Sequence, residues 1–246
     1  MTGPIGGNGW QDAEVVGVNM ARARFRDVDL SGARLQSVIL AGAEIGGDIR
    51  GLVVNDVEVA PLIEAELDRR HPERRKLRAT TPAGVREAWQ VVEEFWAGTM
   101  AAAADLSDAD RHRSVNGEWS FVQTLRHLIF ITDAWLSHAL LGLANPFHPY
   151  GLPPSFVTGA DAYGVDLAAA PSYEEVVAVR AGRMAQVRAF LQQVTQPELD
   201  QTREPNLAPG WPPAAPRLTT TCLHVLFNEE WAHHRFAVRD LAVLRR

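Results

Sequence analysis

The chain has 246 residues, of which 46% are hydrophobic and 22% charged, a composition typical of a soluble protein with one or two domains. Its formal net charge of -6 offers no basic surface, so we expect no nucleic-acid partner. A single cysteine, Cys222, excludes an internal disulfide framework and fits a reducing compartment. Neither a signal-like N-terminus nor a run of about 18 apolar residues is present. We therefore expect a cytoplasmic protein with no membrane partner.

A five-residue repeat follows the N-terminus. Large apolar residues recur at every fifth position, and a small or β-branched residue lies two places before each of them. The large positions are Val15, Met20, Phe25, Leu30, Leu35, Leu40 and Ile45. A period of five fits neither a helix nor a flat strand, but it fits a solenoid coil in which one residue in five points to the axis.

This pattern resembles the pentapeptide-repeat family, whose members form a right-handed square β-helix with four pentapeptides per coil. The resemblance implies a short β-helical segment over residues 12–60. Repeat units need neighbours to bury their faces, and these repeats cover less than two coils. We therefore expect the segment to dock on another surface or to mediate a homodimer.

Residues 51–62 alternate like a pair of strands with a turn at Asn55-Asp56. The charged stretch 63–77 has a helical pattern up to Pro72. We interpret residues 61–80 as a linker to a main domain over residues 81–246.

Four helical patterns make up the main domain. They begin near Thr81, Gly117, Ser172 and Arg217. Thr81 is a good N-cap, and Ser120 with Gln123, and Ser172 with Glu175, have capping-box spacing. Two loops rich in Pro and Gly, 143–171 and 195–216, connect these helices, and loops of this length are usually functional or mobile. The sequence therefore predicts a mainly α protein built on a four-helix bundle.

The last helical pattern contains NEEWAHHR, in which Glu229 and His233 are four residues apart, as are Glu230 and His234. Such a spacing places a carboxylate and an imidazole on one helix face, where they could grip one divalent metal ion. His127 lies in the middle of the most apolar helix and could be a third ligand. If the three side chains share a metal, we expect His127 within about 8 Å of one of the two pairs.

Other readings stay open at this point. His127 could be a hydrogen-bonded core histidine, and NEEWAHHR could be a charged helix face. His138, three turns after His127, could replace it as a ligand. Cys222 is interpreted as a small buried thiol, and Trp119 as a packing residue of the bundle.

The segments GEWSFVQTLRHL and NEEWAHHRFAVRDL resemble the DinB-like superfamily of metal-binding four-helix bundles. That family binds a divalent metal with a histidine of the second helix and a [HE]-x-x-x-H pair of the last. The resemblance implies a metal site at His127, Glu229 and His233, with Glu230 and His234 as the pair obtained by a one-residue slip.

A glutamate in the first position of the pair resembles the thiol-dependent branch of the superfamily, which includes mycothiol-dependent maleylpyruvate isomerase. The resemblance implies a divalent metal (Zn, Ni or Fe), mycothiol as a co-substrate and a small-molecule substrate for S-transfer or hydrolysis. The competing hypothesis is a non-catalytic binding or dimerisation module stabilised by a structural metal.

Overall fold

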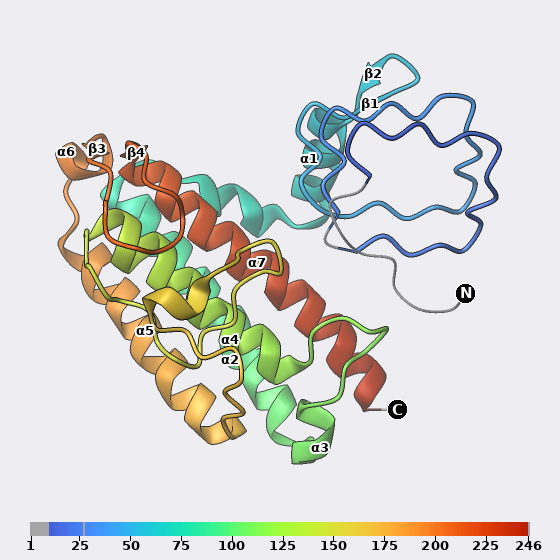
Figure 1. The fold of residues 1–246 in the computed structure, drawn as a ribbon. Coiled ribbons are helices and arrows are strands. Elements are labelled where there is room, and N and C mark those ends of the chain that lie inside the picture. The colour runs from blue at the N-terminus through green and yellow to red at the C-terminus, as the bar shows by residue number, and fades with distance from the viewer. Residues whose placement is uncertain (1–9, 27, 246) are drawn as a thin grey trace. The chain divides into compact units, whose positions relative to one another are not determined.

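The computed structural model describes residues 10–26 and 28–245. The chain divides into two compact units, one ending at Ala43 and the other beginning at Glu44 (Figure 1). The second unit is helical and contains all the helices and strands assigned in the described residues.

In the first unit the repeat appears as a series of turns spaced ten residues apart. Each turn is closed by a backbone hydrogen bond of 2.9–3.2 Å, donated by Ala13, Ala23, Ala33 and Ala43 to the residue three places before. No β-strand is assigned among the described residues up to position 50, so the expected β-helix is not seen. The large apolar side chains of the repeat are exposed to solvent, with Phe25 64% and Leu35 61% exposed. In a solenoid, strands pair between one coil and the next coil stacked on it. A segment this short has too few coils for such pairing.

The second unit opens with the hairpin that the sequence predicts. Strands β1 (Val53–Val54) and β2 (Val57–Glu58) pair antiparallel. Asn55 and Asp56 between them have φ values of 49° and 65°. Left-handed backbone at both central positions is the geometry of a type I′ turn, for which Asn and Asp are favoured.

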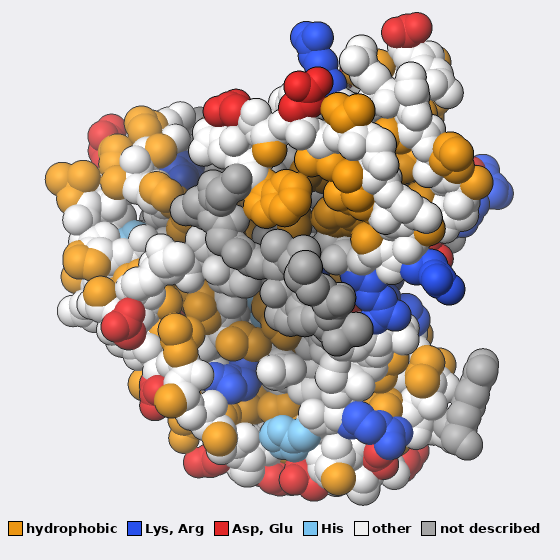
Figure 2. Space-filling model, turned by 45° about the vertical axis from the view of Figure 1, so that its right-hand side comes forward, with side chains coloured by type: hydrophobic (Ala, Val, Ile, Leu, Met, Phe, Trp, Pro, Cys, Tyr) orange, Lys and Arg blue, Asp and Glu red, His pale blue; other side chains and the backbone are white. Residues whose placement is uncertain are grey.

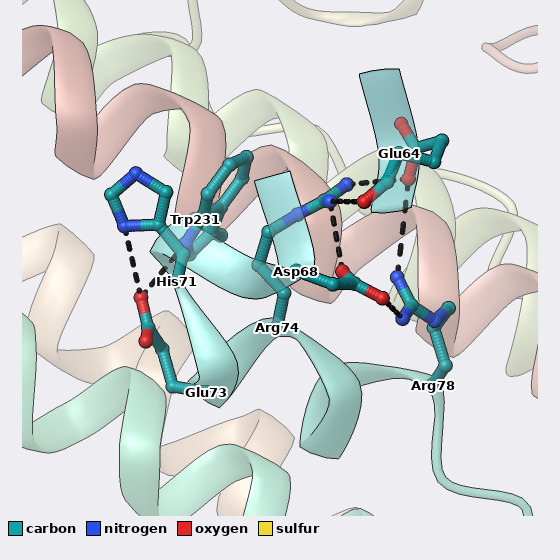
Figure 3. A network of polar contacts seen from close by, with 7 residues as sticks. All are labelled: Glu64, Asp68, His71, Glu73, Arg74, Arg78 and Trp231. Atoms are coloured by element: carbon teal, nitrogen blue, oxygen red, sulfur yellow. Dashed lines mark hydrogen bonds and ion pairs between the residues drawn. The ribbon is translucent and has the colours of Figure 1, made fainter. Parts of the chain in front are cut away.

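A short helical region then packs against the last helix of the bundle. It consists of α1 (Ala60–Arg70) and the 3₁₀ helix η1 (Pro72–Arg78). Figure 3 shows Arg74 of η1 between the carboxylates of α1, with Asp68 at 3.0 Å, while its guanidinium lies 4.5 Å from the ring centre of Trp231. The ion pairs hold η1 against α1, and the contact of the buried Arg74 side chain (6% exposed) with Trp231 connects the segment to the last helix.

Four long helices form the bundle: α2 (Pro82–Ala104), α4 (Phe121–Thr132), α5 (Tyr173–Gln193) and α7 (Thr219–Leu244). Shorter elements are α3 (Asp108–Arg111), η3 (Ala160–Tyr163), α6 (Gln196–Leu199) and the antiparallel pair β3 (Thr202–Arg203) and β4 (Arg217–Leu218). Helix α4 packs between α5 and α7, and α2 packs on both of these helices (Figure 1). The four-helix architecture predicted for this region is therefore observed.

The helix starts follow the predicted caps. The side chain of Thr81 accepts a hydrogen bond from the first turn of α2. Ser120 with Gln123, and Ser172 with Glu175, form complete capping boxes at the starts of α4 and α5. These caps pair N–H groups that a helix start would otherwise leave without partners.

Helix α4 is the centre of the bundle. All but one of its residues from Phe121 to Thr132 are buried, as its apolar character on every side predicts. The helical path continues beyond it as a π-helix, η2 (Asp133–Leu140), which hydrophobic periodicity does not reveal. No helix in the described part of the chain is both long and apolar enough to cross a membrane.

Candidate metal centre

His127 is held in the middle of α4 with its ring almost fully buried, at 3% exposure. Its Nδ1 lies 2.9 Å from the carbonyl oxygen of Leu152, in the long loop after η2. A carbonyl only accepts hydrogen bonds, so Nδ1 carries the proton and donates it. The other nitrogen, Nε2, then offers a lone pair, which is the arrangement found in metal-binding histidines with a carbonyl partner.

Two side chains of α7 meet that lone pair. Glu229 Oε2 lies 3.4 Å from Nε2 of His127 and 3.2 Å from Nε2 of His233. The potential ligand atoms of the three residues all lie within 4.8 Å of one another. The structure therefore brings His127 together with Glu229 and His233, well within the separation that the sequence argument requires.

These separations suit a metal ion. Ligand atoms in a tetrahedral site with bonds of about 2.1 Å lie about 3.4 Å apart, close to the two distances observed. The lone pair of His127 also faces a carboxylate oxygen, and two acceptors face each other favourably only when a cation or proton lies between them. The donor set of two imidazoles and a carboxylate is one that zinc, nickel and iron accept.

The surroundings keep these groups ready to act as ligands. Burial lowers the pKa of His127, which favours the neutral ring. Burial by itself would raise the pKa of Glu229, but positive charge on the facing imidazoles of His127 and His233 lowers that pKa to about 2, and a metal cation between these groups would act in the same direction. The carboxylate is therefore ionised and available at neutral pH.

Trp119, directly before the N-cap residue of α4, packs against the rings of both histidines of the cluster. Its ring centre lies 4.6 Å from that of His127 and 5.8 Å from that of His233. The neighbouring Glu118 forms an ion pair with Arg239 of α7, which ties the segment before α4 to the helix that carries the other two ligands. Trp119, expected from the sequence only to pack the bundle, therefore also contacts both imidazoles, and its place just before the helix of His127 was an available signal.

Comparison with known families agrees with this arrangement. A family model described as the DinB superfamily matches residues 91–237. The chain belongs to the DinB superfamily. Pentapeptide repeats match residues 11–44 in 8 copies, which confirms the second resemblance. The comparison with curated proteins gave no match, and the comparison with solved structures gave none either. Membership of the DinB superfamily supports a metal-associated protein.

In this DinB bundle the slipped pair faces away from His127. Glu230 is completely buried and forms an ion pair with Arg180 of α5. The ring of His234 packs against Phe95 and Trp96 of α2, with centre-to-centre distances of 4.3 and 5.6 Å. The high cost of burying an unpaired carboxylate is thus avoided by a partner from another helix.

Two further candidates of the DinB chain lie elsewhere. His138 is in η2, where its Nδ1 accepts a hydrogen bond of 3.0 Å from the side-chain amide of Asn206. It is therefore held by the second long loop and takes no part in the cluster of His127. Cys222 is buried, and burial raises the pKa of its thiol to about 11, so it carries no thiolate at neutral pH.

Proposed function

We propose that His127, Glu229 and His233 hold one divalent ion (Zn, Ni or Fe), and that the chain is a metal-dependent cytoplasmic enzyme acting on a small molecule. The reaction we favour is S-transfer from a low-molecular-weight thiol of the mycothiol type, with hydrolysis as the closest variant. The observation that carries the proposal is the convergence of two histidine nitrogens on one carboxylate oxygen, at 3.4 and 3.2 Å.

Each residue has a distinct task in this proposal. The Leu152 carbonyl orients His127 through its Nδ1 proton. With a divalent ion bound, the single negative charge of Glu229 would leave the site with a net positive charge, which would favour a thiolate or hydroxide as the next ligand. A divalent ion held by three protein ligands would have an open position and would lower the pKa of a thiol or water bound there. Trp119 limits the access of bulk water to the two imidazoles.

Elemental analysis tests the metal assignment. We expect about one divalent ion per chain in native protein and loss of the ion in His127→Gln, which keeps a donor for the Leu152 carbonyl. His224→Gln is the matched control, because His224 is on α7 outside the cluster and its Nε2 lies 2.9 Å from the Ala79 carbonyl oxygen. Full metal content in His127→Gln would contradict the assignment.

Thiol transfer needs a separate assay of the metal-loaded protein with mycothiol and a panel of electrophiles. S-transfer would be supported if native protein consumed the thiol and His127→Gln did not. Turnover that persists without metal would contradict the proposed mechanism, even if the metal site were correct.

One observation favours a second function, that of a non-catalytic, metal-stabilised module that forms homodimers. Large apolar side chains of the repeat are exposed, among them Phe25, Leu30 and Leu35, and groups of exposed hydrophobic side chains are visible in Figure 2. Exposed apolar patches commonly mark interaction surfaces. Sizing with and without residues 1–50 tests this function, and an unchanged monomer in both cases would remove it.

A further inference from the structure

A cavity of about 220 Å³ opens at the start of α4, apart from the three proposed metal ligands. Its wall includes His112, Gln123 and Arg126, together with the backbone turn of residues 169–171. Within the part of the chain that the structure describes, no aspartate or glutamate lines it. Arg126 thus gives the wall a positive charge, and no carboxylate among the described lining residues neutralises it.

Arg126 is the unusual member of this wall, because its buried charge forms no ion pair with any described residue. The side chain is only 8% exposed, and it donates to the carbonyl oxygens of Tyr150 and Ala169, each at 2.9 Å. Its Nη2 is buried without a hydrogen-bond partner, and within the described residues no carboxylate forms an ion pair with it. The charge of Asp166 attracts the guanidinium of Arg126, but the two groups are too far apart to form an ion pair. A buried guanidinium with neutral acceptors alone is costly, and a bound anion would offset that cost.

The helix itself favours an anion at the same place. Ser120, the N-cap of the 12-residue helix α4, lines the cavity, and so do Val122 and Gln123 of the first turn. The N-terminus of a helix carries a partial positive charge, which stabilises negative groups near the first turn. Two independent features, the unpaired guanidinium and the helix end, therefore act in the same direction.

We propose that this cavity binds a small oxyanion, the carboxylate or phosphate group of a small molecule, with Arg126 as its principal partner. Gln123 lies one helical turn before His127 on the same side of α4. Arg126 and His127 also donate to neighbouring carbonyls of one loop segment, those of Tyr150 and Leu152. The anion therefore binds on the helix that carries a proposed metal ligand, but its binding does not require the metal.

The test is a titration of the full-length protein with acetate and with inorganic phosphate at constant ionic strength, followed by thermal unfolding. We expect a saturable rise in melting temperature with at least one anion, both in metal-loaded and in chelator-treated protein. The two anions distinguish a carboxylate site from a phosphate site.

Ala170→Glu is the decisive variant, because this exposed residue lines the cavity and its substitution spares the core. A carboxylate at the mouth should weaken anion binding about 10-fold by repulsion. Ala181→Glu adds the same charge at an exposed position of α5 and should leave the affinity unchanged. Arg126→Gln should also abolish binding, but it removes two backbone contacts and can fail to fold.

Equal anion affinities in Ala170→Glu and Ala181→Glu would overturn the proposal, as would the lack of a saturable response to either anion. A response seen only with metal present would also overturn it, since the anion would then be binding the ion. An anion response that is kept after chelation, and that is weakened in Ala170→Glu but not in Ala181→Glu, would support the proposal.

Discussion

The two adjacent glutamates of α7 should respond in opposite ways to the same substitution. Glu230→Gln leaves Arg180 buried without its carboxylate, at 4% side-chain exposure. Breaking a buried ion pair from one side typically costs about 3–5 kcal/mol. For a unit of this size that loss corresponds to a fall of roughly 6–20 °C in melting temperature. The metal ligands are untouched, so metal affinity should stay close to that of native protein.

Glu229→Gln should show the reverse pattern. Its side chain is 31% exposed and pairs with no arginine among the described residues, so the loss of metal-free stability should be smaller than in Glu230→Gln. Loss of an outer-shell partner alone typically lowers metal affinity by about 10- to 100-fold, and loss of a ligand should exceed about 100-fold.

Denaturant unfolding in chelator and competition with a calibrated metal chelator measure the two quantities separately. The double variant Arg180→Met/Glu230→Leu should recover most of the lost stability, because an apolar pair can replace a buried ion pair. If Glu230→Gln lost the metal while Glu229→Gln kept it, the assignment of ligands on α7 would be wrong.

Three further outcomes follow from the structure. Free metal at 100 times its dissociation constant should stabilise the protein by about 2.7 kcal/mol, so chelator should lower the melting temperature measured by calorimetry; an unchanged value would contradict a native metal site. Burial, only partly offset by Arg183, raises the pKa of Asp133 from 3.8 to about 6, so the folded state binds this proton more tightly than the unfolded state. Stability of chelated protein should therefore fall by about 3 kcal/mol as pH rises from about 4 to 6, and Asp133→Asn should remove this contribution in denaturant titrations; an identical slope in the variant would refute the assignment. Glu118→Gln breaks the ion pair with Arg239 beside Trp119 and should speed metal removal by chelator without changing the dissociation constant, because entry and exit accelerate together. Stopped-flow measurements should show no such effect in Glu87→Gln, which breaks an exposed ion pair with Lys76, and equal rates in both variants would exclude a role of the Glu118–Arg239 ion pair in metal release.

The amount predictable from sequence differs between the two units. In the helical unit the caps at Thr81, Ser120 and Ser172 were recognisable because capping is a local interaction between residues three apart. The turn at Asn55 and Asp56 was recognisable for the same reason. The period of the N-terminal repeat was equally clear, but the strands of the expected β-helix are not seen, since ladder pairing depends on neighbouring coils.

The candidate site was only half determined by spacing. The sequence places Glu229 and His233 on one face of a helix and Glu230 and His234 on the next, and nothing local distinguishes the two faces. The rotation of α7 about its axis decides between them, and that rotation depends on packing. Arg180 of α5 pairs with Glu230, and this contact leaves Glu229 facing His127.

By itself, then, the amino-acid order determined where helices start, which segments are apolar and which residues share a helix face. Only the tertiary structure decided that His127 meets a carboxylate 102 positions away, that Trp119 covers both imidazoles, and that Arg126 has no ion-pair partner among the described residues. The physical reason is range. Caps, turns and helix faces depend on neighbours within one turn, whereas a metal cluster or a buried charge depends on how separate helices pack.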